Sequence, residues 1–279
     1  MAGASAVEAP LKRWTLWALA LGAVGCATGP LAENPSPGAS ETRSEWIPLF
    51  NGRDLSGWTP KIRGLASGQD PLGTFRVEDG MLVVSYESYE AFDDRFGHLF
   101  YEQPFGSYRL RVEYRFVGDQ VVGGPDWAHR NSGIMFHSQS PATMGIDQDF
   151  PISLEAQFLG GNGRDPRPTA NLCTPGTHVE MGGDLVTRHC IAAQGPTFHG
   201  DRWVTVEIEV HEDRLVRHLV NGATVLEYGA PVVGGSEVSG FLPQAKRDGT
   251  PLGSGFLALQ SESHPIQFRR VELLLLEGN

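Results

Sequence analysis

Segment 108–116 alternates strictly between apolar and charged side chains, and this pattern restricts the fold more than any other feature of the chain. A repeat of two residues is the period of a β-strand, whose successive side chains point to opposite faces of a sheet. The segment is therefore predicted to be a strand with one face in a core and one face toward water. The apolar face carries Tyr108, Leu110, Val112, Tyr114 and Phe116, and the charged face carries Arg109, Arg111, Glu113 and Arg115.

Similar patterns recur along the chain and favour a sandwich of two sheets. Asp79-Gly80 and Asn221-Gly222 stand between apolar runs and predict tight hairpin turns. Only short helical turns are expected, for example near 88–92. The 35 glycines and 19 prolines fit a chain with many turns between short strands. These patterns predict one all-β, two-sheet domain over 45–279. The further candidate strands are 152–158, 203–210, 255–260 and 265–276.

The composition excludes one large class of function. The chain has 279 residues with 33 acidic and 22 basic side chains, for a net charge of −11. It contains no block rich in lysine or arginine, so nucleic-acid binding driven by counterion release is not expected. The hydrophobic fraction of 40% is that of a globular protein.

The N-terminus resembles an export signal. Lys12 and Arg13 precede an apolar run over 14–25, which is shorter than the roughly 20 residues that a membrane-spanning helix needs. Small residues before Cys26 resemble a bacterial lipoprotein cleavage site, although Ala23 stands where leucine is usual. Residues 1–26 are thus expected to be a lipoprotein-type signal with Cys26 as the lipidated residue, and a plain signal peptide is the alternative. The protein would be exported, as a periplasmic or cell-envelope lipoprotein.

Residues 27–44 are rich in proline, glycine, serine and glutamate and show no apolar period. This composition predicts a disordered tether between the signal and the folded domain.

Two further cysteines, Cys173 and Cys190, lie in one loop-rich stretch. In an oxidising compartment they are expected to form a disulfide, which would add roughly 3 kcal/mol of stability. The alternative is a structural zinc site formed with His178 and His189. Because His189 and Cys190 are adjacent, they fit the spaced pattern of zinc ligands poorly, and the disulfide is favoured.

Polar residues at alternate strand positions are candidates for a ligand site on a curved sheet. Arg111, Glu113 and Arg115 share one such face, Glu155 and Gln157 a second, and Asn131 and His137 a third. The plain interpretation is that each of these side chains faces water. Their occurrence on several strands favours a site for an extended polar ligand.

A family resemblance enters through a series of motifs in order along the chain. The opening segment WIPLFNGRDLSGW, at 46–58, closely resembles the start of the 3-keto-disaccharide hydrolase domain family. The later matches are NSGIMFHSQ (131–139), SLEAQFLGG (153–161), ANLCTPGTHVEMGGDLVTRHC (170–190), GDRWVTVEIEV (200–210), RHLVNGATVLEY (217–228) and LALQSESHPIQFRRVEL (257–273). The resemblance covers nearly all of 45–276. It implies a concanavalin A-like jelly roll, export in bacteria and action on sugars oxidised at C3. The family commonly has arginine where this chain has His137.

The segment that starts at Glu155 bears on the chemistry. Many glycosidases of this fold carry carboxylates at alternate positions of one strand, in the pattern Glu-x-Asp-x-(x)-Glu. Here Gln157 and Gly160 replace the other carboxylates, so only Glu155 remains on this strand. An ordinary two-carboxylate hydrolysis is therefore disfavoured.

A 3-keto sugar needs a different set of groups. Its ketone acidifies the C2 hydrogen, so that one base can form an enolate, which expels the C1 substituent by β-elimination; later addition of water gives net hydrolysis. Glu155 is expected to be the base, or a ligand of a divalent cation that also binds His137 and Asp126. His137 is the second acid or base candidate. Asn131, Gln157 and Arg115 would bind hydroxyl groups or the enolate oxygen, Glu113 would contribute or pair with a neighbouring arginine, and His189 and His178 would cover the site.

The function expected from the sequence is cleavage of glycosidic bonds in 3-keto sugars by an exported hydrolase or lyase. No flavin or nicotinamide motif occurs, so a partner sugar 3-dehydrogenase would supply the oxidised substrate. The alternative is a non-catalytic, lectin-like carbohydrate-binding module, in which Trp58, Trp127 or Tyr86 would stack on sugar rings. A structural envelope lipoprotein is a further alternative.

Overall fold

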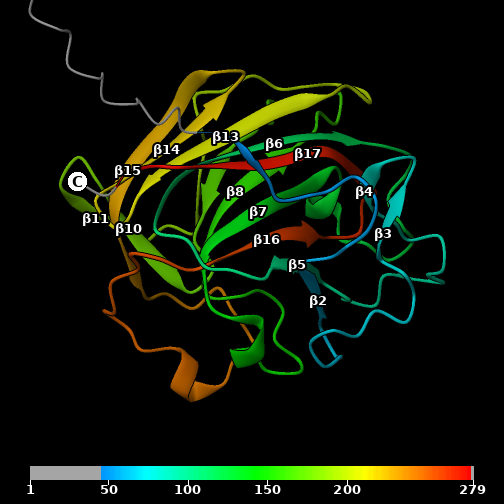
Figure 1. Cartoon of the computed structure of the whole chain (residues 1–279), viewed down its shortest axis with the longest axis horizontal. Helices are drawn as coiled ribbons and strands as arrows, with labels where there is room; N and C mark the ends of the chain where they lie inside the picture. The colour runs from blue at the N-terminus through cyan, green and yellow to red at the C-terminus, as the bar shows by residue number, and fades with distance from the viewer. Residues whose placement is uncertain (1–44, 278–279) are drawn as a thin grey trace, which may run out of the picture. The chain divides into compact units, whose positions relative to one another are not determined.

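Two antiparallel sheets pack face to face in this computed structural model (Figure 1). The structure describes residues 45–277. The ten-stranded sheet has the order β11-β10-β15-β14-β13-β6-β17-β4-β3, with β1 paired to β17. Its strands are β1 (Ile47–Pro48), β3 (Phe75–Glu78), β4 (Met81–Val84), β6 (Ser107–Phe116), β10 (Thr177–Met181), β11 (Asp184–Val186), β13 (Val204–His211), β14 (Leu215–Val220), β15 (Ala223–Val233) and β17 (Ile266–Leu275).

The second sheet has seven strands in the order β12-β9-β8-β7-β16-β5-β2. Three short 3-10 helices, η1 (Asp126–Ala128), η2 (Pro141–Thr143) and η3 (Pro243–Ala245), are the only helices among the described residues. None of them is long and apolar enough to cross a membrane. The strands of this sheet are β2 (Trp58–Ile62), β5 (Gly97–Tyr101), β7 (Asn131–Ser138), β8 (Leu154–Leu159), β9 (Asn171–Cys173), β12 (Cys190–Ile191) and β16 (Phe256–Ser261).

The core lies between the two sheets and is built from the apolar faces that the alternation predicts. On β6 every second residue is buried, from Tyr108 to Phe116. On β8 the core positions are Leu154, Ala156 and Phe158, and the Phe158 ring stacks on that of Tyr114 at 4.3 Å from across the sandwich. The predicted all-β, two-sheet sandwich is confirmed.

Both predicted hairpin turns form. Asp79 and Gly80 join β3 to β4, and Asn221 and Gly222 join β14 to β15, all with positive φ angles between 48° and 84°. Asparagine, aspartate and glycine tolerate that backbone region best, and such turns match the twist of paired strands. The stretch 88–92 contains no helix, only a turn in which Tyr89 N donates to Tyr86 O at 3.0 Å.

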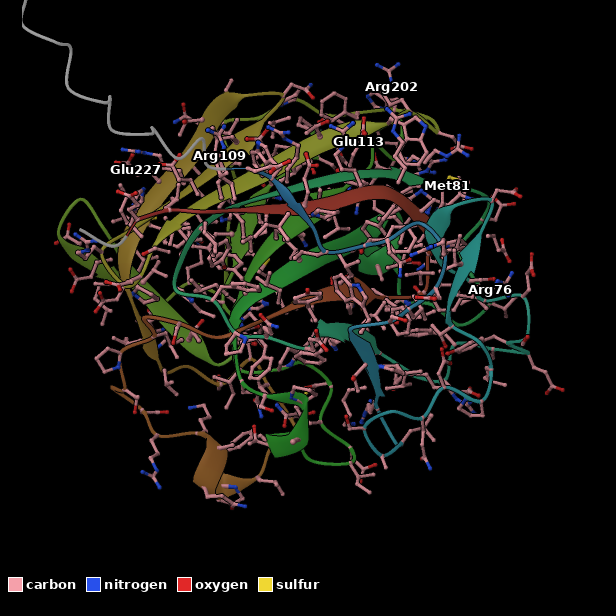
Figure 2. The ribbon with its side chains drawn as sticks, in the orientation of Figure 1. Arg76, Met81, Arg109, Glu113, Arg202 and Glu227 are labelled. Atoms are coloured by element: carbon pink, nitrogen blue, oxygen red, sulfur yellow. A yellow bond between two sulfur atoms is a disulfide. The ribbon has the colours of Figure 1, made fainter. Side chains whose placement is uncertain are left out.

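The outward face of the ten-stranded sheet carries a ladder of paired charges. Glu207 accepts hydrogen bonds from Arg109 Nε at 2.5 Å and from Arg111 Nε at 2.9 Å. Arg111 also donates to Glu272 and lies over the Trp46 ring at 3.9 Å. Figure 2 shows Arg109 and Glu113 on this outward side, away from the seven-stranded sheet. These charges pair with one another across the sheet face.

The predicted signal segment, Cys26 and the predicted tether over 27–44 lie outside the described residues.

Candidate functional site

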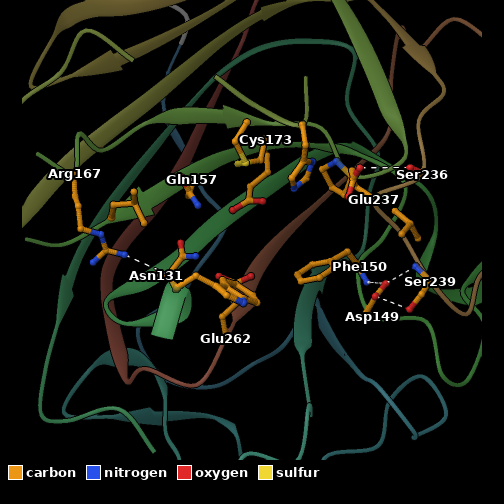
Figure 3. A pocket seen from close by; sticks show the side chains of 17 residues that line it. Asn131, Asp149, Phe150, Gln157, Arg167, Cys173, Ser236, Glu237, Ser239 and Glu262 are labelled. Atoms are coloured by element: carbon orange, nitrogen blue, oxygen red, sulfur yellow. Dashed lines mark hydrogen bonds between the residues drawn. A yellow bond between two sulfur atoms is a disulfide. The ribbon is translucent and has the colours of Figure 1, made fainter. Parts of the chain in front are cut away.

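A cavity of about 550 Å³ lies on the face of the seven-stranded sheet that points away from the core (Figure 3). The alternation of β8 explains its floor, because Leu154, Ala156 and Phe158 fill the core and the residues between them must point the other way. The lining residues on the central strands are Asn131, Glu155, Gln157, Leu159 and Cys173. Those on the surrounding loops and strand ends are Trp127, Asp149, Phe150, Arg167, Pro175, His189, Cys190, Ser236, Glu237, Val238, Ser239 and Glu262.

Glu155 lies on the cavity floor and is held there by its neighbours. Its strand register places it between Met135 on β7 and Cys173 on β9. Only 5% of the residue is exposed. Its carboxyl group extends over Gly133, where a β-carbon would lie 2.6 Å from Glu155 Oε1. The missing side chain at Gly133 therefore provides the space for this carboxyl group.

A second carboxyl group faces the same cavity. Glu262 follows the end of β16 and is 3% exposed, and its Oε2 is buried without a hydrogen-bond partner. The labelled Glu262 side chain reaches the cavity from the lower side of Figure 3. The expectation of a single carboxyl group was therefore incomplete, because it considered one strand and the second group comes from another.

Burial sets the charge state of this pair. Burial raises the pKa of Glu155 to about 8. Burial and the nearby Glu155 charge raise the pKa of Glu262 well above its ordinary value. Burial is the largest cause of both pKa shifts, and no positively charged side chain lowers either pKa. Two carboxyl groups in one low-dielectric site avoid carrying two charges, so the pair holds a proton at neutral pH.

Amide side chains add neutral polar groups beside the carboxyl pair. Asn171 Nδ2 donates to Gln157 Oε1 at 3.0 Å, which orients the Gln157 amide and leaves its Nε2 as a donor. Figure 3 shows Asn131 between Arg167 and Glu262, with Gln157 nearer to Cys173. Asn131 is buried, and its Oδ1 has no hydrogen-bond partner. Unpaired buried polar groups of this kind are costly, and a polar ligand would satisfy them.

The Arg167 side chain lines the cavity and is held in place by backbone carbonyl groups. Its Nη1 donates to His129 O at 2.6 Å and to Gly160 O at 2.7 Å. Burial lowers the pKa of its guanidinium group. Because two carbonyl groups hold it, this side chain is pre-positioned toward any anionic or hydroxyl group that enters.

Aromatic side chains line the side of the cavity near η1. Phe96 stacks on Trp127 with ring centroids 5.9 Å apart, and the ring centroids of Phe96 and Phe150 are 5.1 Å apart. Trp127 is 53% exposed, which is high for a tryptophan. Such a supported, exposed ring suits the apolar face of a sugar.

The predicted disulfide between Cys173 and Cys190 forms and lines the cavity. The two residues are direct partners in the register of β9 and β12. The ligand atoms of Cys173, His189 and Cys190 lie within 4.8 Å of one another. The bonded sulfurs are not thiolates, however, and His178 is not part of the group, so this structure does not hold the zinc alternative.

The structure brings together some of the residues predicted from sequence. Glu155, Gln157, Asn131 and His189 all line the cavity. Burial lowers the pKa of His189, and the His189 carbonyl accepts hydrogen bonds from Thr174.

Glu113 and Arg115 do not belong to this group. They lie on β6, on the outward face of the other sheet. Glu113 pairs with Arg269 at 2.5 Å. Arg115 donates to Gln267 at 2.8 Å and lies 4.7 Å over the Trp203 ring. Their faces alternate as predicted, but their strand belongs to the sheet without the cavity.

His137 also lies elsewhere, for a different reason. A register irregularity separates the pairs Met135–Ala258 and Ser138–Phe256, and His137 has a φ of 46°. This bulge breaks the alternation that places Asn131 on the cavity face. The ring is 1% exposed, and its Nε2 lies 2.9 Å from Glu212 O in the turn between β13 and β14 of the opposite sheet. Burial lowers its pKa.

The predicted cation ligands are not assembled either. Asp126 lies in η1 and lines a neighbouring hollow with Arg164 and Asp165, on the other side of Trp127 and Arg167, which line both. With His137 turned toward the opposite sheet, only Glu155 of the expected three lines this cavity.

Sequence reasoning missed Glu262, Arg167 and the wall at 236–239. Glu262 carried a usable signal, since it continues the alternate positions Ala258 and Gln260 past the end of an apolar strand. Arg167 carried none, because it lies in a loop without a periodic pattern.

Comparison with known proteins identifies a family. Residues 45–274 match a family described as the 3-keto-alpha-glucoside-1,2-lyase-like domain. No curated protein matches the chain.

Solved structures resemble the fold at low identity. A Bacillus subtilis protein of unknown function with a galectin-like fold is 13% identical over 84% of this chain and 96% of its own, with a TM-score of 0.50. A Parabacteroides distasonis protein provisionally assigned as a glycosyl hydrolase is 16% identical over 83% of this chain and all of its own, with a TM-score of 0.49. A Bacillus licheniformis β-glucanase is 11% identical over 84% of this chain and 98% of its own, with a TM-score of 0.45.

Proposed function

Because the chain belongs to the 3-keto-alpha-glucoside-1,2-lyase-like domain family, we propose that it cleaves glycosidic bonds of 3-keto glucosides by β-elimination. The observation that carries the proposal is the buried carboxyl group of Glu155 on the floor of a cavity large enough for a sugar. A base in such a place is shielded from water and lies next to the bound ring.

Glu155 is the proposed base for the C2 proton. Burial raises its pKa to about 8, which makes its carboxylate a much stronger base than an exposed one. The C2–H electron pair forms the enolate, the C3 carbonyl then re-forms, and the C1–O bond breaks to leave a double bond between C1 and C2. The proton is held on Glu155. A well-placed base of this kind contributes about 10²–10⁴-fold in rate.

Neutral donors would stabilise the enolate oxygen. Gln157 Nε2 is oriented by Asn171, and buried Asn131 lines the same cavity. Donors that are already aligned stabilise developing negative charge by about 3–4 kcal/mol each. Trp127 would lie against the apolar face of one ring, as in many sugar sites.

One specific observation favours a second candidate, an ordinary two-carboxylate glycosidase. Glu155 and Glu262 face one cavity, as the paired carboxyl groups of such enzymes do. This candidate predicts cleavage of unoxidised glycosides, which lack the acidic C2 hydrogen, and β-elimination predicts no such cleavage. A carbohydrate-binding module predicts binding without cleavage of either substrate.

The test is an assay with paired substrates. Purified protein is incubated with a 3-keto disaccharide and with the same disaccharide unoxidised, and released sugar and the C1–C2 unsaturated product are followed. We expect turnover of the keto sugar only, its loss in Glu155→Gln, and its retention in Glu113→Gln, a matched change on the outward face. Turnover of the unoxidised sugar, or full activity in Glu155→Gln, would overturn the proposal.

The cellular setting is also a proposal, and it rests on the sequence alone. Lys12, Arg13 and the apolar run before Cys26 support export with a lipid anchor. A partner sugar 3-dehydrogenase would then supply the keto sugar. Fractionation of cells that produce the wild-type and Cys26→Ala proteins tests the anchor, and a soluble wild-type protein would contradict it.

A further inference from the structure

Glu262 is a buried acid that the base-only mechanism leaves without a task. It is 3% exposed, it lines the same cavity as Glu155, and its Oε2 has no hydrogen-bond partner. A buried carboxyl group without a partner costs free energy, and folding alone gives no reason to keep it. Its placement therefore indicates a use with a bound ligand.

The two carboxyl groups differ in their positions. Glu155 projects from the start of β8 over Gly133, and Glu262 follows the last residue of β16. Figure 3 shows Glu262 reaching into the cavity beyond Asn131, on the side opposite the disulfide. A sugar in the cavity would thus meet one carboxyl group at the floor and the other at the side.

We propose that Glu262 is the general acid that protonates the departing oxygen at C1, while Glu155 removes the proton at C2. This inference rests on the proposed function. Departure of a sugar or alkyl alkoxide is slow without protonation, because such an oxygen is a strong base. The cavity offers Glu262 as that acid, because the residue lines the cavity wall and no protein group holds its Oε2.

The charge states fit the two tasks. Burial raises both pKa values, and the charge of Glu155 raises that of Glu262 further. Ionisation of one carboxyl group disfavours ionisation of the other, so the pair passes through a state that holds a single proton. In that state the proposal places the charge on Glu155 at the floor, as the base, and the proton on Glu262 at the side, as the acid. Environments that separate two carboxyl groups in this way define acid and base roles.

The cycle balances with water as its only further reactant. In the elimination, Glu155 accepts the C2 proton, the C1–O bond breaks, and Glu262 gives its proton to the leaving oxygen. In the reverse direction, Glu262 now accepts a proton from water as that water adds to C1, and Glu155 returns a proton to C2. The net result is hydrolysis, and both carboxyl groups end in their starting states.

The experiment compares two leaving groups on the same 3-keto glucoside. One substrate releases 4-nitrophenol, which departs without protonation, and the other releases methanol, which needs it. We expect Glu262→Gln to lower kcat/KM by about 10²–10⁴-fold for the methyl substrate and by less than tenfold for the nitrophenyl substrate. Glu155→Gln should lower both severely.

Each result bears on a separate claim. Equal losses for both leaving groups in Glu262→Gln, or no loss for either, would overturn the role of Glu262 as the acid. If the wild-type protein cleaves neither keto sugar, the proposed function itself fails.

A second readout is the pH profile, because Glu262→Gln should remove the fall in kcat/KM at high pH. A profile that keeps this fall in folded Glu262→Gln would also contradict the proposal, and thermal denaturation verifies that the variant is folded.

Discussion

The carboxyl group of Glu155 occupies the space that a side chain at Gly133 would take. A β-carbon at Gly133 would lie 2.6 Å from Glu155 Oε1 and 2.9 Å from its Cγ. The two residues lie on neighbouring strands that pair in antiparallel register, so neither backbone is free to move away. The position of the proposed base thus depends on the absence of a side chain on the adjacent strand.

Gly133→Ala is expected to lower activity indirectly, by changing the position of the Glu155 side chain. The new methyl group displaces the Glu155 side chain, and a misplacement of about 1 Å at a catalytic group costs up to roughly 10²-fold in rate. We expect kcat/KM on a 3-keto disaccharide to fall at least tenfold. Glu155→Ala removes both Oε1 and Cγ, so Gly133→Ala should destabilise the Glu155→Ala variant less than it destabilises the wild-type protein. Additive losses of stability would show that the two positions are independent.

Activity should rise with pH through the neutral range. The active form has Glu155 ionised and Glu262 protonated, and the pKa of Glu155 is about 8. We therefore expect kcat/KM to increase about tenfold per pH unit below this value and to fall again when Glu262 loses its proton. The two apparent values belong to the pair. A pH–rate profile that is flat from pH 5 to 8 would contradict this assignment.

Glu155→Gln should stabilise the fold while it removes activity. The ordinary pKa of 4.5 applies to the unfolded chain, and the folded value is about 8. Between these values the folded protein retains a proton that the unfolded chain releases, so the stability of the wild-type protein falls as pH rises. Each pKa unit corresponds to about 1.4 kcal/mol. The Tm advantage of Glu155→Gln should therefore grow from pH 5 to 8 and vanish near pH 4. A constant difference across this range would argue against a buried proton at this position.

Local pattern predicted much of the fold. The alternation of 108–116 and the two hairpin turns at Asp79-Gly80 and Asn221-Gly222 each depend on neighbouring residues, and all three formed as expected. The pairing of Cys173 with Cys190 also followed, since both lie in one short stretch. Gln157 and Glu155 share a face because a strand has a period of two.

The site was only partly predictable because it depends on how strands combine. Alternation assigns a face within a strand, but it does not assign the strand to a sheet, so Glu113 was grouped with Glu155 although their sheets differ. It also fails at a bulge, where His137 turns toward Glu212. Glu262 lines the same cavity as Glu155 but follows a strand that is far away in sequence. Arg167 lines that cavity from a loop.

The charge ladder on the outward face should contribute to stability and not to activity. Glu207 is buried beneath Arg109 and Arg111 and accepts a hydrogen bond from each. Both arginines are partly exposed, so the loss in Glu207→Gln should be modest, about 1–2 kcal/mol. Urea denaturation measures this loss, and kcat/KM should stay within twofold of the wild-type value. A large loss of activity at unchanged stability would place a functional site on this face.

Loss of the disulfide should affect stability and substrate affinity more than the chemical step. Cys173 and Cys190 close a loop with a sequence separation of 17, for which about 3 kcal/mol of stabilisation is expected. In a domain of this size, that corresponds to a fall in Tm of roughly 6–12 °C. The same bond lines the cavity, whereas the backbones of Glu155 and Glu262 are held by β8 and by the end of β16. We therefore expect the double variant Cys173→Ser, Cys190→Ser to raise KM for a 3-keto disaccharide several-fold and to change kcat less. Thermal denaturation and steady-state kinetics test both parts, and the reduced wild-type protein should behave like the variant. An unchanged Tm, or a fall in kcat with KM unchanged, would show that the bond has another role.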